Sequence, residues 1–413
     1  MSDSSYMIEG VAESYGISVE RRRREIAAHH GVPDFVFRPA VIAAGSGHVE
    51  VGDFLLWVGD VVAIVSSKSR APEAAATETQ DRRRRWFERN IEEAYGQVRG
   101  TFGTLTRAEP GSIVLVSERG VQVPWDPSAV WGYIGVIVVD APPPDEDFAP
   151  PVMTDRIPTL AMLGDDWDAL NFVLPSTMAL IRYLGRRVMA IPRCPMGAEL
   201  DVLALILEHE NTGEPIAIPE EGLPRGHFES VAAAHPDWFL GGHSDDRFAL
   251  VIDSMIEAAA DADPAYSTAA GPLVYMKIVE FLDRIPLLSR VSIGKAVVER
   301  CERVGREGGR ITTYMAVPHG LLVVVIDDQD RPSRAEWLRG VVFARHSQLL
   351  DAGAPSSVVT LGVGTQPLPS SGGRSHDFVL LNGGIRSDPQ FRQERDALYG
   401  AKDLAVVVAQ LDL

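Results

Sequence analysis

Cysteine is nearly absent from this chain of 413 residues, because Cys194 and Cys301 are the only two. They lie far apart and show no metal-ligand spacing, which excludes a disulfide framework and fits a reducing compartment. No apolar run reaches the roughly 18 residues of a membrane-spanning helix. The N-terminus, MSDSSYMIEG, lacks the basic and apolar regions of a signal peptide. We therefore expect a cytoplasmic protein without a membrane span.

Several enzyme signatures are missing as well. The sequence contains no G-x-S-x-G elbow, no H-E-x-x-H zinc helix, no C-x-x-C pair and no G-x-G-x-x-G after a strand. Around Lys295, the upstream glycine and the following Ser or Thr of a phosphate-binding loop are lacking. No internal repeat of fixed period is present either. These absences argue against serine hydrolases, zinc peptidases and dinucleotide-dependent enzymes of those types.

Composition is that of an ordinary globular protein. The sequence is 46% hydrophobic and 23% charged, and its length predicts two or three domains with ample core. The formal net charge of −18 disfavours a general coat for nucleic acid. It remains compatible with a local basic groove, because steering depends on where the charges lie as well as on their sum.

The most informative stretch is a predicted β-hairpin. Two apolar runs, Phe54–Val58 and Val61–Val65, flank Gly59-Asp60, and a glycine at the first central position suits a two-residue II′ turn. Both faces of the hairpin are apolar, which is typical of strands buried in the middle of a sheet.

Polar residues gather at one end of that hairpin. With Val58 facing Val61, Asp53 stands opposite Ser66, and Lys68 lies on the same face two residues further on. A carboxylate, a hydroxyl and an ammonium group therefore converge, and we take this end as the candidate site.

These residues resemble the PD-(D/E)XK nuclease-like superfamily, in a divergent and uncharacterised bacterial branch with the pattern E-x-x-D followed by S-x-K. Asp53 matches the first acid and Lys68 the lysine, whereas Ser66 stands where the second acid belongs. Glu50, in the preceding loop, is the carboxylate that could replace it. Gln97 matches a glutamine that points at the site from the next helix, although a solvent-facing glutamine explains it equally well.

The resemblance implies an α/β fold and a metal-dependent nuclease that cleaves DNA or RNA, with a role in bacterial defence. Glu50 and Asp53 would hold Mg²⁺ or Mn²⁺, Lys68 would stabilise developing charge, and Ser66 and Gln97 would assist. The alternative is a degenerate nuclease-like fold that serves as a nucleic-acid-binding or protein-assembly module without a cofactor. A protein partner or a homo-oligomer is compatible with the sequence, which identifies neither.

Two arginine runs are the candidate contacts to nucleic acid. One, Arg21–Arg24, lies on a predicted helix Val19–His30, mostly outward. The other, Arg82–Arg85, opens a helix predicted from Asp81 to about Val98, where four cations oppose the helix dipole. We expect Asp81, Glu88 or a bound phosphate to compensate them. A solvated surface is the alternative for both runs; the residues proposed to contact phosphates are Arg21, Arg24, Arg82, Arg83, Arg84 and Arg85.

The sequence predicts three regions around one linker. The nuclease-like mixed-sheet domain spans residues 1–140, and the proline- and acid-rich segment 141–151 is the linker. A mainly helical region, 152–305, and an α+β domain, 306–413, follow. The last region repeats the order hairpin, helix, strand, with Asp327, Asp328 and Arg331 near its equivalent site, which suggests a duplicated core. The acids of Asp165–Asp168 are interpreted as helix caps, with cation binding as the alternative.

Overall fold

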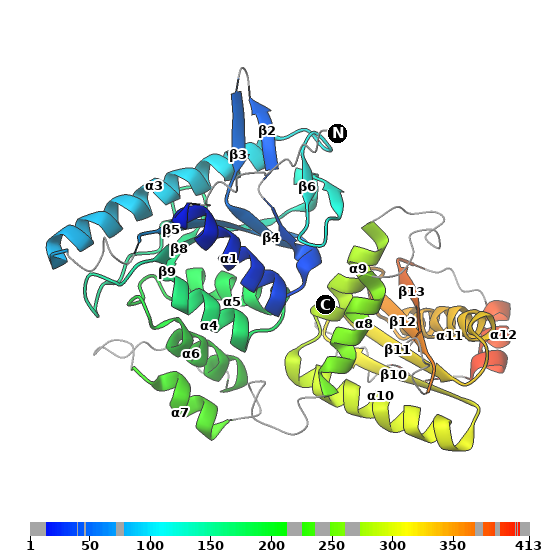
Figure 1. Ribbon diagram of the computed structural model, residues 1–413. Helices are drawn as coiled ribbons and strands as arrows, with labels where there is room; N and C mark the ends of the chain where they lie inside the picture. The colour runs from blue at the N-terminus through cyan, green and yellow to red at the C-terminus, as the bar shows by residue number, and fades with distance from the viewer. Residues whose placement is uncertain are drawn as a thin grey trace, which may run out of the picture. The chain divides into compact units, whose positions relative to one another are not determined.

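The computed structural model describes residues 14–38, 40–44, 47–71, 78–212, 225–235, 248–260, 273–367, 375–384, 389–400, 402 and 404. The protein is mixed α/β, which confirms the predicted fold class. It divides into two compact units: Met1–Ala233, hereafter unit 1, and Ala234–Leu413, hereafter unit 2 (Figure 1). No helix within the described ranges has the length and apolarity needed to cross a membrane.

Unit 1 is built on a five-stranded sheet with the order β1-β4-β5-β8-β9. Its strands are β1 (Val36–Phe37), β4 (Phe54–Val58), β5 (Val61–Ser69), β8 (Gly132–Asp140) and β9 (Thr159–Leu163). The first two pairings are antiparallel, whereas β8 and β9 run parallel to β5. Parallel neighbours need crossover connections, and the helix α3 (Gln80–Arg107) supplies the one between β5 and β8.

The predicted hairpin is confirmed in its register. Val58 pairs with Val61 and Phe54 with Val65, so partners keep the constant sum that the two-residue turn requires. Gly59 has φ of +59°, which suits the first central position of a II′ turn. Apart from the half-buried Trp57 and Val61, the residues of both apolar runs are buried, as predicted.

Helices cover both faces of this sheet. On one face lies α3, whose predicted apolar stripe is buried: Phe87, Ile91, Ala94 and Val98. On the other face lie α1 (Tyr15–His30), α4 (Gly164–Val173) and α5 (Thr177–Ala190), followed by α6 (Glu199–Thr212) and α7 (His227–Ala234). The ring of Phe54 contacts that of Trp167 in α4 at 5.9 Å between centroids. Even-numbered residues of β4 therefore face α4, and their odd-numbered neighbours face α3.

Two short hairpins flank the sheet: β2 (Ala40–Ala44) with β3 (Gly47–Val51), and β6 (Val114–Val116) with β7 (Gln122–Pro124). Glu50 therefore lies in a strand rather than in the loop that the sequence suggested.

The segment 141–151, predicted as a linker between domains, connects two strands of one sheet instead. This segment lies inside unit 1, because β8 before it and β9 after it are parallel neighbours in one sheet. Prolines and acids marked a surface connection correctly, but such a composition does not reveal whether the next strand joins the same sheet. The division between the units falls instead at Ala233, within what the sequence suggested was one helical region.

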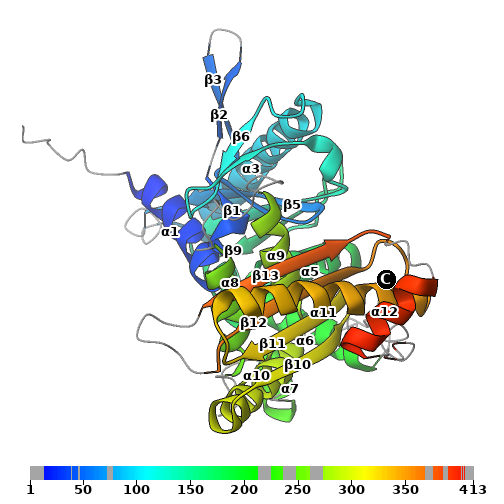
Figure 2. The same ribbon diagram turned by 90° about the vertical axis from the view of Figure 1, so that its right-hand side faces the viewer.

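Unit 2 contains a four-stranded sheet with the order β10-β11-β12-β13. Its elements are α8 (Leu250–Ala260), α9 (Leu273–Asp283), α10 (Leu287–Glu307), β10 (Arg310–Val317), β11 (Gly320–Asp327), α11 (Arg331–Asp351), β12 (Val359–Thr365), β13 (His376–Asn382) and α12 (Pro389–Tyr399). Figure 2 shows α11 along one face of this sheet. There Leu321, Val323 and Val325 pack against its Leu338 and Val342.

Candidate functional site

The polar end of the β4–β5 hairpin meets α3 through two side-chain pairs. Ser66 Oγ donates a hydrogen bond to Gln97 Oε1 at 3.1 Å, and Lys68 Nζ lies 2.9 Å from Glu93 Oε1. Ser66 and Lys68 alternate on one face of β5, and Glu93 and Gln97 are one turn apart on α3, so the pairs form a continuous polar strip. The predicted shared face of Ser66 and Lys68 is thereby confirmed.

Asp53 lies at the same end of the hairpin. Gly52 turns the chain with φ of +64°, and the Asp53 N–H donates to the Val65 carbonyl at 3.2 Å. The Asp53 carboxylate accepts a hydrogen bond from the Ser67 N–H. Asp53 precedes β4, and its bond to Ser67 places its carboxylate at the residue between Ser66 and Lys68. One oxygen of Asp53 is therefore positioned by the backbone beside the polar strip.

Exposure increases along the strip. Ser66 is 1% exposed, whereas the side chain of Lys68 is 15% exposed and that of Glu93 58%. Solvent therefore reaches the Lys68–Glu93 end, while the hydroxyl of Ser66 is buried against Gln97.

Glu93 is the site residue that sequence reasoning missed. Its pKa is lowered, chiefly because Lys68 donates a hydrogen bond to it and adds a positive charge beside it. A signal was available: any α3 register that directs Gln97 toward the hairpin also directs the residue four positions earlier there.

The metal ligands proposed from the sequence stay predictions. Glu50 pairs with Val41 through the backbone of β3, and its side chain lies outside the described atoms. Among the residues that the structure describes, no three His, Cys, Asp or Glu side chains gather as they would around a metal ion. Asp53 and Glu93 are described carboxylates that bond to β5 at this end of the hairpin.

The first arginine run points outward only at Arg21 and Arg22. Arg23 is 2% exposed and bonds to Asp140 at 2.6 Å, and it also pairs with Asp168. Arg24 Nε lies 2.5 Å from Glu118 Oε1, and Arg21 makes a long exposed contact of 3.7 Å with Glu25. Intrachain carboxylates therefore already engage the two candidates on α1.

The second run is engaged in a similar way. Arg84 pairs with Asp145 and lies 5.4 Å from the centroid of the Phe148 ring. Arg83 donates to the Pro143 carbonyl at 3.4 Å and Arg85 to the Asp81 carbonyl at 3.3 Å. Asp145 therefore compensates Arg84, whereas the sequence had suggested Asp81, Glu88 or a bound phosphate for this run. The two arginine runs lie on helices that cover opposite faces of the sheet.

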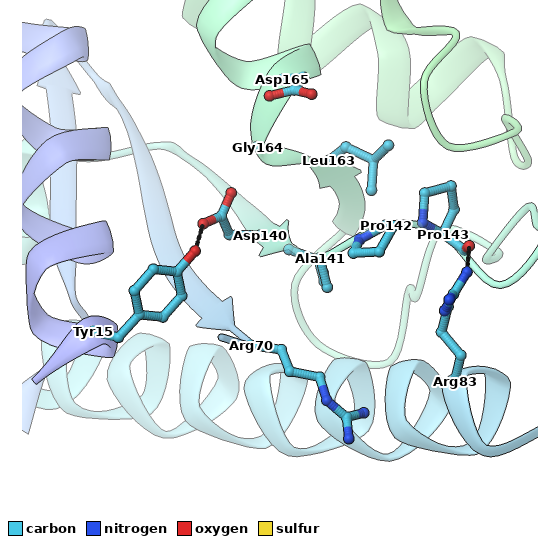
Figure 3. A pocket seen from close by; sticks show the side chains of 11 residues that line it. Tyr15, Arg70, Arg83, Asp140, Ala141, Pro142, Pro143, Leu163, Gly164 and Asp165 are labelled. Carbon is cyan, nitrogen blue, oxygen red and sulfur yellow. Dashed lines mark hydrogen bonds between the residues drawn. The ribbon is translucent and has the colours of Figure 1, made fainter. Parts of the chain in front are cut away.

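A pocket of about 560 Å³ opens beside the strip, where β5, β8 and β9 end. Figure 3 shows Tyr15 donating to Asp140 at 3.1 Å on one side and Arg83 reaching Pro143 on the other. The lining residues are Tyr15, Arg70, Arg83, Val139, Asp140, Ala141, Pro142, Pro143, Leu163, Gly164 and Asp165.

A buried polar network supports the start of α4 behind this pocket. Asp166 accepts hydrogen bonds from the N–H groups of Leu163 at 3.2 Å and Gly197 at 2.8 Å, which confirms the predicted capping role. Burial and the neighbouring Glu199 charge raise the pKa of Asp166 to about 6. Glu199 in turn is bonded by Arg187 at 3.1 Å and by the Tyr183 hydroxyl.

Comparison with known proteins adds no relative: no family model, no curated protein and no solved structure matches this chain.

Proposed function

We propose that unit 1 is a metal-dependent hydrolase of nucleic-acid phosphodiesters. The observation that supports this best is the end of a buried hairpin, where Lys68 pairs with Glu93, Ser66 bonds to Gln97, and the Asp53 carboxylate accepts from the N–H of the intervening Ser67. Two carboxylates and a cation at a partly exposed edge provide charges of both signs where a phosphate could be held. The resemblance of Asp53 and Lys68 to the nuclease motif points in the same direction.

The donor atoms suit a hard dication. Asp53 and Glu93 offer carboxylate oxygens and Gln97 an amide oxygen, and Mg²⁺ commonly binds through one or two carboxylates while keeping several waters. Glu50 is a further candidate ligand from β3. When bound, Mg²⁺ or Mn²⁺ would polarise a phosphoryl oxygen and lower the pKa of a coordinated water.

The chain's own residues have separate roles in this proposal. Lys68 donates to a non-bridging oxygen of the phosphate and stabilises charge that develops there. Glu93 holds Lys68 on the α3 side of the strip until a phosphate replaces it. Gln97 keeps its orientation through Ser66, whose hydroxyl is buried against it.

A non-catalytic nucleic-acid-binding module is the second candidate. It is favoured by Ser66, a buried neutral residue at the position of the second acid, and by the Lys68–Glu93 pair, which satisfies both charges without a ligand. Such a site would bind phosphates weakly and cleave none.

One experiment distinguishes the two candidate functions. The purified protein is incubated with single- and double-stranded DNA and RNA, with Mg²⁺, with Mn²⁺ and with a chelator. We expect metal-dependent cleavage that Asp53→Ala and Lys68→Ala each abolish while the unfolding midpoint is retained, with the exposed Lys402→Ala as matched control. Cleavage that survives both substitutions, or persists in chelator, contradicts the proposal. Binding without cleavage identifies the second candidate.

A further inference from the structure

The pocket beside the strip is built as a ligand site in its own right. Arg70 follows the end of β5, Asp140 ends β8 and Leu163 ends β9, so the pocket lies at the carboxyl edge of three parallel strands. Sheets with parallel strands bind their ligands outside this edge. A volume of about 560 Å³ is that of a pocket for one small organic molecule.

Positive charge dominates one side of the pocket. Arg70 and Arg83 both line it, and the guanidinium of Arg70 lies 5.3 Å from the centroid of the Trp86 ring. Glu78 bonds one terminal nitrogen of Arg70; within the described residues the other, Nη1, is buried without a hydrogen-bond partner. Arg70 therefore has one donor that no described group uses, and a rotation of the guanidinium would present it to an anion in the pocket.

The opposite side is apolar with a single exposed acid. Asp140 is bonded by Arg23 at 2.6 Å and by Tyr15 at 3.1 Å, so its charge is compensated. Asp165 is exposed at the start of α4 and is the acceptor that remains for a ligand hydroxyl. Between the arginines and Asp165 lie the flat apolar surfaces of Pro142 and Pro143 (Figure 3).

We propose that this pocket binds a nucleoside monophosphate unit. Arg70 and Arg83 hold the phosphate, Asp165 accepts from sugar hydroxyls, and the base lies against the proline rings and Tyr15. The unit could belong to a free nucleotide or to the end of a strand. Because Arg70 is two residues beyond Lys68 on the same face of the chain, a strand that enters the pocket passes the proposed cleavage site. Binding itself does not require that cleavage occurs.

Calorimetry on the full chain, with EDTA to prevent metal-dependent cleavage, tests this proposal. The ligands are AMP, adenosine, inorganic phosphate, and one oligonucleotide with either a 5′-phosphate or a 5′-hydroxyl end. We expect AMP to bind at least about tenfold more tightly than adenosine or phosphate, because charge-assisted hydrogen bonds and the apolar surface act together. Binding of the 5′-phosphorylated strand without binding of AMP assigns the pocket to strand ends. Binding of neither overturns the proposal.

Two substitutions and a matched control identify the pocket. Arg70→Gln and Arg83→Gln should each weaken binding by about tenfold or more, whereas Arg107→Gln, exposed on the same helix as Arg83 but outside the lining, should leave it unchanged. If Arg70→Gln fails to fold, because Glu78 loses its partner, Arg83→Gln decides alone. Asp165→Asn should reduce the preference for AMP over its dideoxy analogue. Binding that none of these substitutions weakens would place the ligand elsewhere.

Failure of this inference is distinct from failure of the proposed function. Asp53→Asn should abolish cleavage and leave AMP affinity as in the wild type. Arg83→Gln should weaken AMP binding in EDTA, whether or not the wild type cleaves.

Discussion

Units 1 and 2 repeat one arrangement and use it differently. In each, an antiparallel hairpin with a two-residue turn leads through a long helix to a strand parallel to the second hairpin strand. Counted from the turns, Lys68 of β5 corresponds to Asp327 of β11, and Ser66 to Val325. The repeated order that the sequence suggested is therefore present in the pairing of the strands.

The repeat extends to a detail of packing. Gly135 of β8 and Gly362 of β12 occupy equivalent positions on the parallel strand. A methyl group on Gly135 would overlap Thr159 Oγ1 of β9 and lie 2.7 Å from Val98 of α3, and one on Gly362 would overlap Val342 of α11. In both units a glycine thus lets the crossover helix approach the sheet closely.

The two units differ in the side chains at the end of the second hairpin strand. In unit 1, Lys68 and Glu93 form a partly exposed strip beside α3. In unit 2, Asp327 is completely buried and pairs with Arg310 across the hairpin, while Val325 belongs to the core. The apolar pattern therefore defines the order of hairpin, helix and parallel strand in both units. A few positions at the end of the second hairpin strand decide whether that end carries a candidate site or a structural ion pair.

The largest expected effect contrasts the equivalent residues Asp327 and Lys68. Asp327→Ala removes a fully buried carboxylate and leaves the partly exposed Arg310 without its partner, which should lower the free energy of unfolding by about 3 kcal/mol. Lys68→Ala removes a pair whose acid is exposed and should lower it by less than about 1 kcal/mol, although cleavage is lost. Urea unfolding measures both. Equal destabilisation by the two substitutions would contradict the contrast.

Asp166 should make the free energy of unfolding fall as pH rises. Its pKa in the folded protein is about 6, above the ordinary value of 3.8, so the folded state favours the protonated carboxyl. The contribution of Asp166 to the free energy of unfolding is fully present below about pH 3.8 and is lost as pH rises through about 6. The total loss should be about 3 kcal/mol. Unfolding between pH 4 and pH 8 should show this loss in the wild type and a smaller one in Asp166→Asn. Identical pH profiles would show that another group is responsible.

The paired glycines should respond alike. Gly135→Ala and Gly362→Ala each force a methyl group between sheet and helix and should cost about 1 to 3 kcal/mol of unfolding free energy. Gly96→Ala, in α3 with open space around it, should instead stabilise by up to about 1 kcal/mol. Thermal and urea unfolding provide the comparison. If alanine is tolerated at only one of the two positions, the units share the order of their strands but not this packing of helix on sheet.

The last prediction concerns which residue supplies the second carboxylate ligand of the proposed metal site. If Glu50 supplies it, Glu50→Gln should abolish Mn²⁺ binding as Asp53→Asn does; if Glu93 supplies it, Glu93→Gln should do so. Either loss is expected to exceed about tenfold, and Glu92→Gln on α3 is the matched control. Calorimetric titration decides between them. No binding by the wild type, with a gain in Ser66→Glu or the smaller Ser66→Asp, would favour the non-catalytic module.

The sequence by itself determined the local structure at the site. A period of two and the Gly59-Asp60 turn defined the hairpin register, and a helical stripe defined which face of α3 is buried. These features depend on neighbours a few residues apart, whose geometry is the same in any fold.

Tertiary structure alone decided the rest. Arg23 reads as one more surface arginine until Asp140 and Asp168, 117 and 145 residues away, enclose it. Glu93 is an ordinary helix residue until the sheet brings Lys68 to it. Likewise, only strand pairing shows that β9 continues the sheet across a proline-rich segment. Such partners are selected by packing between distant segments, and no local pattern encodes which segments will meet.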